Sequence, residues 1–271
     1  LVNNIKYNNY DYIIYRYNCE QMDYIISQFP YKHFIHFPHY IDTSIFSNTK
    51  SIKKYDILIY GNLSDWYPFR KRLLKLIEQH NYNCYYFEHP GYNENNEKNE
   101  NTFTIKKDLS LLINQSKLTI CTCSIFQYFV KKYIEISLSG SIICGDFPNL
   151  ENNIYLDNMC NINNNMSDND ILIQINKYLS LSPNEYNNII NNSYNLTLSN
   201  FSHDIGINKF NKFITNILDT LNKTHTLNTL DTLNTLDTQN TLDTLNTLDI
   251  QNTLDNQTLD NQTLDNQTLD N

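Results

Sequence analysis

The chain has 271 residues, 40% of them hydrophobic, so it can bury one sizeable core or two small ones. Its formal net charge is −9, but the segment from Lys223 onward holds one lysine and eight aspartates, which leaves residues 1–222 close to neutral. A body without excess positive charge argues against a nucleic-acid partner, and no apolar run is long enough for a membrane span.

The cysteines and the start of the chain bear on where the protein works. The six cysteines show no metal-ligand spacing, and buried free thiols are typical of a reducing compartment. No signal peptide opens the sequence, so we predict a cytoplasmic protein. The chain starts at Leu1 rather than at a methionine, and we expect an upstream portion to be missing. Abundant asparagine and 21 tyrosines are typical of an AT-rich genome, such as that of a protist or a large DNA virus.

Residues 1–50 predict the end of one domain rather than a whole domain. DYIIYRY, which begins at Asp11, is a candidate strand, and Phe34–Asp42 is typical of a strand that runs into a linker. We therefore interpret residues 1–50 as the remnant of an amino-terminal domain together with a linker.

Residues 51–222 alternate between strand and helix patterns. Short apolar runs predict strands at 55–61, 84–87, 118–122 and 141–145. Apolar residues at helical spacing predict helices from Pro68, over 105–115, around Glu135, over 168–179, from Pro183, and over 205–221 as a closing amphipathic helix. Alternation with short connections predicts an α/β fold, namely a Rossmann-like parallel sheet with helices on both faces.

The predicted topology also places the ligand. In an open parallel sheet the ligand lies beyond the carboxyl ends of the strands, which here are the turns after Gly61, Phe87, Thr122 and Gly145. Neither G-x-G-x-x-G nor G-x-x-x-x-G-K-[ST] occurs, which disfavours an ordinary dinucleotide loop and a Walker-type phosphate loop.

The last segment is a repeat. TLNTLDTLNTLD spaces its aspartates six residues apart, and NQTLD later repeats every five residues. Neither period keeps the leucines on one face of a helix, so little core can form. The pattern predicts that residues 223–271 are a disordered low-complexity tail.

Glu135 is the least expected residue of the body, because it stands between two isoleucines in KKYIEISLSGSIICGD. One interpretation is a surface ion pair with Lys131, since exposed pairs of this kind are common and nearly neutral in energy. The other is a carboxylate that accepts hydrogen bonds from the hydroxyls of a sugar. On a helix after the third strand, Tyr128, Lys132 and Ser139 are expected to project near it.

Three segments resemble one family. KKYIEISLSGSIICGDFP is similar to the donor-site segment of GT-B glycosyltransferases, particularly the spore-maturation-type "glycosyl transferases group 1" proteins. YDILIYGNLSDWYPFRKRLL resembles the first strand–helix unit of that family's carboxyl-terminal domain, and HFPHYIDTSIF resembles the linker before it. The order and spacing of the segments extend the resemblance over about residues 34–222. The resemblance implies that residues 51–222 form a nucleotide-sugar-binding domain.

The resemblance also implies roles for single residues near Glu135. In the family, two glutamates and a later glycine line the donor site. Glu135 matches the second glutamate, which holds the ribose of the nucleotide, and Gly140 matches the glycine. Gln127 stands at the position of the first glutamate, which usually contacts the transferred sugar, so an uncharged amide replaces a carboxylate there.

Five further residues match the family at lower specificity. Arg70 resembles a diphosphate ligand, with a helix-surface arginine as the equal alternative, and Lys132 is a second phosphate candidate. Ser124 either touches the base or a phosphate or caps a helix, and Gly61 ends the first strand at the donor site. His89 resembles the family's HPG turn, although a plain turn residue is the simpler interpretation.

The expected activity is the transfer of a sugar from a nucleoside diphosphate to a hydroxyl of a glycan, protein or lipid acceptor. The donor is a substrate, and no cofactor or metal is implied, since no DxD-type acidic pair lies beside the predicted site. The family places most catalytic groups on the amino-terminal domain, so no catalytic residue is assigned. A non-catalytic nucleotide-sugar-binding module or pseudoenzyme, favoured by Gln127, and a nucleotide-sugar epimerase of the same architecture are the alternatives.

Overall fold

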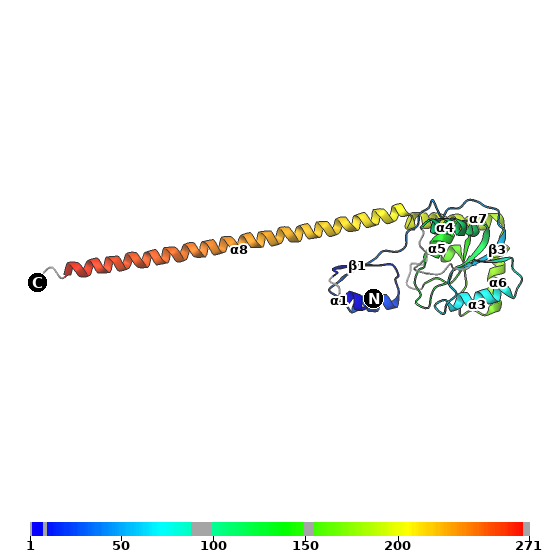
Figure 1. Cartoon of the computed structure of the whole chain (residues 1–271), viewed down its shortest axis with the longest axis horizontal. Helices are drawn as coiled ribbons and strands as arrows, with labels where there is room; N and C mark the ends of the chain where they lie inside the picture. The colour runs from blue at the N-terminus through cyan, green and yellow to red at the C-terminus, as the bar shows by residue number, and fades with distance from the viewer. Residues whose placement is uncertain (1, 8–9, 88–98, 149–153, 268–271) are drawn as a thin grey trace. The chain divides into compact units, whose positions relative to one another are not determined.

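The computed structural model describes residues 2–7, 10–87, 99–148 and 154–267 (Figure 1). The chain divides into two compact units, Leu1–Ile207 and Asn208–Asn271. The first unit contains both sheets, and the second consists of helix.

The body of the first unit is a five-stranded, all-parallel sheet with strand order β4-β3-β5-β6-β7. Its strands are β3 (Tyr55–Tyr60), β4 (Cys84–Phe87), β5 (Ser116–Ile120), β6 (Ile142–Gly145) and β7 (Met159–Asn161). The last four residues of β3 and all of β6 are buried, which is why these strands are continuous apolar runs.

Helices cover both faces of this sheet (Figure 1). They are α3 (Pro68–Glu78), α4 (Asn99–Asn114), α5 (Lys132–Leu138), α6 (Asp168–Leu179) and α7 (Pro183–Phe201), with a 3-10 turn η1 (Leu156–Asn158). Ile57 and Ile59 of β3 pack with Leu73 of α3 on one face, and Leu58 packs with Ile134 of α5 on the other. This alternation along β3 gives the sheet two separate cores and confirms the predicted α/β class.

The first fifty residues add a small element of their own. They contain α1 (Val2–Tyr7), β1 (Tyr12–Tyr15), α2 (Glu20–Ser27) and β2 (His33–His36), and β1 pairs with β2 in parallel. The following linker is fixed to the body, because the Ile41 N–H donates to the carbonyl of Phe201 at 2.9 Å.

The segment before Glu135 differs from the prediction. Gln127 and Tyr128 lie in the loop after β5 and not on a helix, because α5 begins only at Lys132. Gln127 has a φ of +51°, a left-handed conformation that a right-handed helix does not accept. The expectation that Tyr128 and Glu135 share a helix face is therefore wrong. The strand β7 and the helices α1 and α2 were also not predicted.

The second unit belongs to α8 (His203–Gln267). The predicted closing helix over 205–221 forms, but its side chains Phe210, Ile214 and Leu218 are exposed. The sequence predicts disorder from residue 223, whereas the helix continues to Gln267. Its regular geometry needs only local contacts, such as the threonine hydroxyls that donate to the carbonyl four residues earlier. No helix within the described residues combines the length and apolarity that a bilayer crossing requires.

Candidate functional site

Two cations meet the backbone where β3 ends. Gly61 follows Tyr60 with a φ of +94°, a conformation open to glycine at little cost. A Cβ at this position would collide with the ammonium group of Lys132 and would lie 3.4 Å from Nη1 of Arg70. The absence of a side chain at Gly61 therefore lets both cations approach the carboxyl edge of the sheet.

Arg70 comes from the first turn of α3 and is only 1% exposed. Its Nη1 donates to the carbonyl of Asn62 at 2.8 Å and its Nη2 to the carbonyl of Thr122 at 3.2 Å. The guanidinium carbon lies 4.1 Å from the ring centroid of Tyr67, in a cation–π arrangement. The side chain thus joins the loops that follow β3 and β5 without meeting a carboxylate in any described ion pair.

Lys132, at the start of α5, is half-buried beside Arg70. Its Nζ donates to the carbonyl of Tyr60 and lies 4.3 Å from the centroid of the Tyr60 ring. Burial, and then the positive charge of Arg70, lower the pKa of this amine to about 7. A fixed anion nearby would restore the protonated form.

Glu135 lies one turn further along α5 and is 8% exposed. The Tyr60 hydroxyl donates to its Oε2 at 2.9 Å, and Nζ of Lys131 lies 3.3 Å from its Oε1. The ion pair with Lys131 is therefore present, but the carboxylate is mostly buried rather than in bulk water. It contacts the side chain of Tyr60, whose backbone carbonyl binds Lys132, so it lies next to the cation pair.

Unsatisfied polar atoms surround the same edge. Ser64 Oγ, Arg70 Nε and Thr122 Oγ1 are buried and have no hydrogen-bond partner among the described residues. Ser64 is on the loop after β3, and Thr122 is on the loop after β5. Buried polar groups normally find a partner, because each unmade hydrogen bond costs about 1–3 kcal/mol. One donor of Arg70 and two hydroxyls on the loops after β3 and β5 therefore lack an acceptor, which a ligand with several acceptor oxygens would supply.

Ser124 and Gln127 shape the loop after β5. The buried hydroxyl of Ser124 accepts from the Phe126 N–H at 3.2 Å, and its carbonyl accepts from the Gln127 N–H at 3.0 Å. Gln127 is exposed and holds the left-handed conformation noted above. Ser124 therefore has a structural task as a turn former, which is close to its predicted alternative as a cap.

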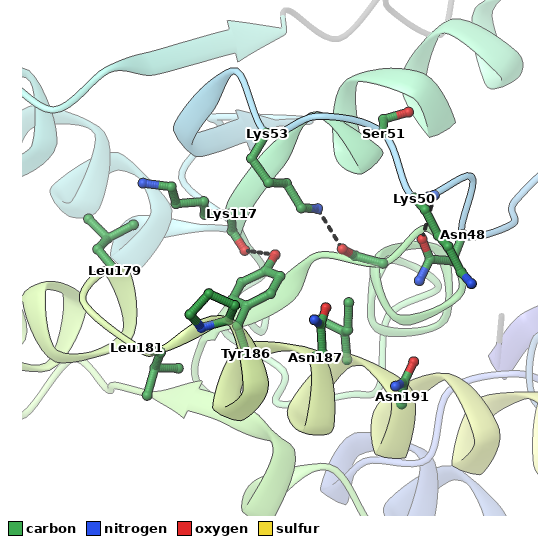
Figure 2. A pocket seen from close by; sticks show the side chains of 13 residues that line it. Asn48, Lys50, Ser51, Lys53, Lys117, Leu179, Leu181, Tyr186, Asn187 and Asn191 are labelled. Atoms are coloured by element: carbon green, nitrogen blue, oxygen red, sulfur yellow. Dashed lines mark hydrogen bonds between the residues drawn. The ribbon is translucent and has the colours of Figure 1, made fainter.

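Gly140 does not belong to this group, which corrects its place among the donor-site residues. It lies between α5 and β6, at the amino edge of the sheet, whereas Gly61 lies at the carboxyl edge. Its carbonyl accepts from Nζ of Lys53 at 2.6 Å, and a Cβ there would collide with the side chain of Asn48. Gly140 lines a separate cavity of about 680 Å³ with Lys53 and Tyr186 (Figure 2).

Asp146 is a candidate residue that sequence reasoning missed. It directly follows β6, and its Oδ1 accepts from the Cys123 N–H at 2.7 Å, so it links two strand ends. Burial raises the pKa of this carboxyl to about 6, and the hydrogen bond from the Cys123 N–H and the charge of Arg70 only partly oppose that effect. An acidic residue placed immediately after a buried strand was the available signal. His89 lies outside the described residues, and no cluster of metal-ligating side chains occurs within them.

Comparisons with known proteins address the fold. No protein-family profile and no curated protein matches the sequence. Among solved structures, a sucrose-phosphate synthase from Thermosynechococcus elongatus is similar with a TM-score of 0.53 and 10% identity, over 78% of this chain and 59% of that one. The N-terminal domain of Candida albicans trehalose-6-phosphate phosphatase is similar with a TM-score of 0.50 and 14% identity, over 77% and 58%.

A third similar structure is the C-terminal domain of a glycosyl transferase group 1 family protein from Francisella tularensis, with a TM-score of 0.40 and 14% identity, over 60% of this chain and 98% of that one. The chain spans about three fifths of the length of the first two structures. Similarity at these identities shows the fold and leaves the activity to be argued from the site. The chain has the fold of the GT-B glycosyltransferases.

Proposed function

We propose that this chain binds a nucleoside-diphosphate sugar at the carboxyl edge of its sheet and serves the donor side of glycosyl transfer. The observation that carries the proposal is the pair of cations at Gly61, buried Arg70 and half-buried Lys132, together with the unsatisfied Arg70 Nε and the unsatisfied hydroxyls of two loops at the same edge. A diphosphate supplies acceptor oxygens for these atoms and a negative charge for Arg70 and Lys132, which form no ion pair among the described residues. The edge is also where open parallel sheets bind ligands.

Each residue then has a task. Arg70 and Lys132 neutralise the diphosphate, and they stabilise the charge that grows on the leaving nucleoside diphosphate as the glycosidic C–O bond breaks. The hydroxyls of Ser64 and Thr122 donate to phosphate oxygens. Glu135 accepts hydrogen bonds from the ribose hydroxyls, for which its Oε atoms keep free lone pairs beside their contacts with Tyr60 and Lys131.

The sugar passes to a hydroxyl of a glycan, protein or lipid acceptor. The groups that bind and deprotonate this acceptor are not assigned to residues of this chain, which spans about three fifths of the first two similar structures. The donor is the substrate, and neither a cofactor nor a metal is part of the proposal.

A non-catalytic nucleotide-sugar-binding module is the second candidate. It is favoured by Gln127, an exposed amide at the position where the family resemblance expects a carboxylate near the transferred sugar. Both candidates share the same donor pocket and differ only in turnover.

Calorimetry with the full chain tests the pocket. UDP, GDP, ADP and dTDP are titrated into the wild type and into Glu135→Gln, which keeps an acceptor for the Tyr60 hydroxyl but removes the charge. Loss of a charged hydrogen-bond acceptor weakens binding by about 1.5 kcal/mol or more, roughly tenfold. Glu78→Gln, an exposed glutamate on α3, is the matched control and leaves affinity unchanged.

Two results contradict the proposal. Absence of binding for all four nucleotides removes the donor pocket itself. Equal affinities for the wild type and Glu135→Gln remove the ribose contact but leave the phosphate site to be tested with Arg70→Met. A wild type that binds nucleotide and hydrolyses or transfers the sugar of the matching nucleotide sugar separates the transferase from the non-catalytic module.

A further inference from the structure

Three aromatic rings form a surface beside the cation pair, and we call them the aromatic platform: Trp66, Phe126 and Tyr128. Trp66 is the only tryptophan of the chain and is 53% exposed. Its ring stacks on Phe126 with a centroid distance of 5.3 Å and an interplanar angle of 28°. Phe126 in turn lies nearly parallel to Tyr128, at 6.5 Å and 12°. An indole with one face packed and much of its surface open is available for stacking.

The platform is held in place by contacts between the two loops that carry it. The Ile125 N–H donates to the carbonyl of Trp66 at 2.9 Å, which ties the loop after β5 to the loop after β3. The hydroxyls of Tyr67 and Tyr128 lie 3.5 Å apart. Tyr67 also stacks on the Arg70 guanidinium at 4.1 Å. The platform is therefore coupled directly to the proposed phosphate site.

The contacts occur in a fixed order along the segment that leaves β3. The Tyr60 side chain contacts Glu135, the Tyr60 carbonyl binds Lys132, the Asn62 carbonyl binds Arg70, and Trp66 stands five residues beyond Gly61. A nucleoside-diphosphate sugar has its parts in the same order, namely ribose, diphosphate and sugar. Laid with its ribose at Glu135 and its diphosphate at the cations, such a ligand directs its sugar ring, and not its base, toward the platform.

We infer that Trp66, backed by Phe126, is a stacking platform for a pyranose ring at the sugar end of the donor site. This inference rests on the proposed function and adds a subsite to it. A pyranose presents a flat face of C–H groups, which packs on the exposed indole and removes apolar surface of both from water. The ring is either the sugar of the donor or the terminal sugar of a saccharide acceptor, and the experiment separates these two sources.

The single tryptophan makes the test direct, because all indole emission of the full chain comes from Trp66. The first arm compares UDP with UDP-glucose, and GDP with GDP-mannose. A donor sugar on the platform changes the emission beyond the change caused by the nucleotide alone. The second arm adds maltose or chitobiose to the chain saturated with UDP or GDP. An acceptor sugar on the platform changes the emission only in this second arm.

Calorimetry with variants supplies a readout independent of fluorescence. Trp66→Ala weakens binding of the ring-bearing ligand by about fivefold, the scale of one aromatic contact, while the affinity for UDP or GDP alone stays within twofold. Ile125→Ala is the matched control, since Ile125 is 51% exposed on the same loop and its side chain is not part of the ring stack. It binds as the wild type does.

The failure of this inference differs from the failure of the proposed function. If UDP or GDP binds and no sugar changes the emission or responds to Trp66→Ala, the platform is not a sugar subsite, whereas the donor pocket stands. If Trp66→Ala weakens UDP itself as much as UDP-glucose, the ring on the platform is the base, and the orientation inferred above is wrong. If no nucleotide and no sugar binds, both proposals fall together.

Discussion

The two edges of the central sheet each hold a lysine whose pKa is lowered, and the two lysines differ in their partners. At the amino edge, Lys53 donates to the carbonyls of Gly140, Asn114 and Ser116 at 2.6, 2.8 and 3.0 Å, and Figure 2 shows the side chain reaching the first of these. At the carboxyl edge, Lys132 donates to one carbonyl and faces Arg70. The first ammonium group has a partner for every proton, and the second does not.

The difference indicates what each lysine is for. Lys53 binds the carbonyls of Asn114 at the end of α4, of Ser116 at the start of β5 and of Gly140 in the turn after α5, so it holds three chain segments together. Burial still lowers the pKa of Lys53 to about 8, so its charge is held at a cost that the three hydrogen bonds offset. Lys132 lies beside another cation and beside unsatisfied hydroxyls. The half-buried Lys53 thus uses all its donors within the fold, whereas Lys132 has donors left for the ligand proposed above.

The largest expected effect on stability comes from replacing Lys53 at the amino edge of the sheet. Lys53→Met leaves three carbonyls without a donor, and it lowers the free energy of unfolding by about 3 kcal/mol. Lys54→Met, the exposed neighbour, changes it by less than about 0.5 kcal/mol. Urea unfolding measures both. Nucleotide affinity of the folded Lys53→Met protein stays that of the wild type, and a loss of affinity there would overturn the division of tasks between the edges.

The next largest effect is the pH dependence of nucleotide-sugar binding at the carboxyl edge. Because the pKa of Lys132 is lowered to about 7 and a bound diphosphate requires the charged amine, affinity for UDP-glucose falls as pH rises above 7. The expected decrease from pH 6 to pH 8 is about tenfold, the change in the protonated fraction of an amine with a pKa of about 7. The phosphates of UDP-glucose do not titrate in this range, so the change belongs to the protein.

The effect of Lys132 on the pH dependence must be distinguished from the effects of other titratable groups near it. Burial raises the pKa of the Cys121 thiol to about 12, which lies outside the range tested. Asp146, with a pKa raised to about 6, gains negative charge over the same range and weakens anion binding in the same direction. The affinity of Asp146→Asn for UDP-glucose is therefore still expected to fall above pH 7, whereas that of Lys132→Met is not. Calorimetry at half-unit pH steps that shows no slope above pH 7 in the wild type would contradict the role of Lys132.

The strands and helices around the two lysines could be predicted from the sequence better than the hydrogen-bond partners of these lysines. Continuous apolar runs marked β3 and β6, and Pro68 marked the start of α3, because burial and proline geometry act locally. Arg70 and Lys132 were also named in advance. Their placement at Gly61 needs the sheet to bring α3 and α5 to one edge, which the predicted topology supplied.

The rest depends on contacts that sequence spacing does not encode. The three carbonyl partners of Lys53 lie 61, 63 and 87 residues away along the sequence. The residues around Lys53 therefore do not indicate that its side chain hydrogen-bonds three carbonyls. Gly140 was assigned to the donor site because it matches the glycine of the family motif, but α5 carries it to the opposite edge. The turn after Thr122 was predicted to bind the ligand, but no sequence pattern shows that the hydroxyls of Thr122 and Ser64 are buried without a hydrogen-bond partner.

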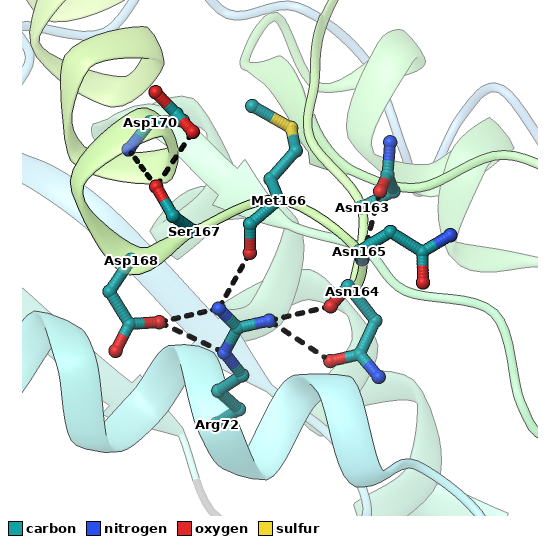
Figure 3. A network of polar contacts seen from close by, with 8 residues as sticks. All are labelled: Arg72, Asn163, Asn164, Asn165, Met166, Ser167, Asp168 and Asp170. Atoms are coloured by element: carbon teal, nitrogen blue, oxygen red, sulfur yellow. Dashed lines mark hydrogen bonds and ion pairs between the residues drawn. The ribbon is translucent and has the colours of Figure 1, made fainter.

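The smallest expected effect on stability comes from replacing Arg72, which lies on the same helix as Arg70. Arg72 stands two residues after Arg70 on α3, and all three of its guanidinium nitrogens are bound: Nε and Nη2 to Asp168, Nη1 to Asn164, and Nη2 also to Met166 (Figure 3). It therefore joins α3 to the start of α6. Arg72→Met removes a partly exposed network and lowers the free energy of unfolding by about 1 kcal/mol.

Nucleotide affinity decides between the two arginines. Arg72→Met leaves it unchanged, since every donor of Arg72 already has a partner inside the protein. Arg70→Met weakens it by about tenfold or more, because Arg70 Nε is unsatisfied and the side chain is one of the two cations at Gly61. Calorimetry on the two variants compares the same charge change two residues apart. Equal losses would mean that net charge on α3, rather than the satisfied or unsatisfied state of each arginine, governs binding.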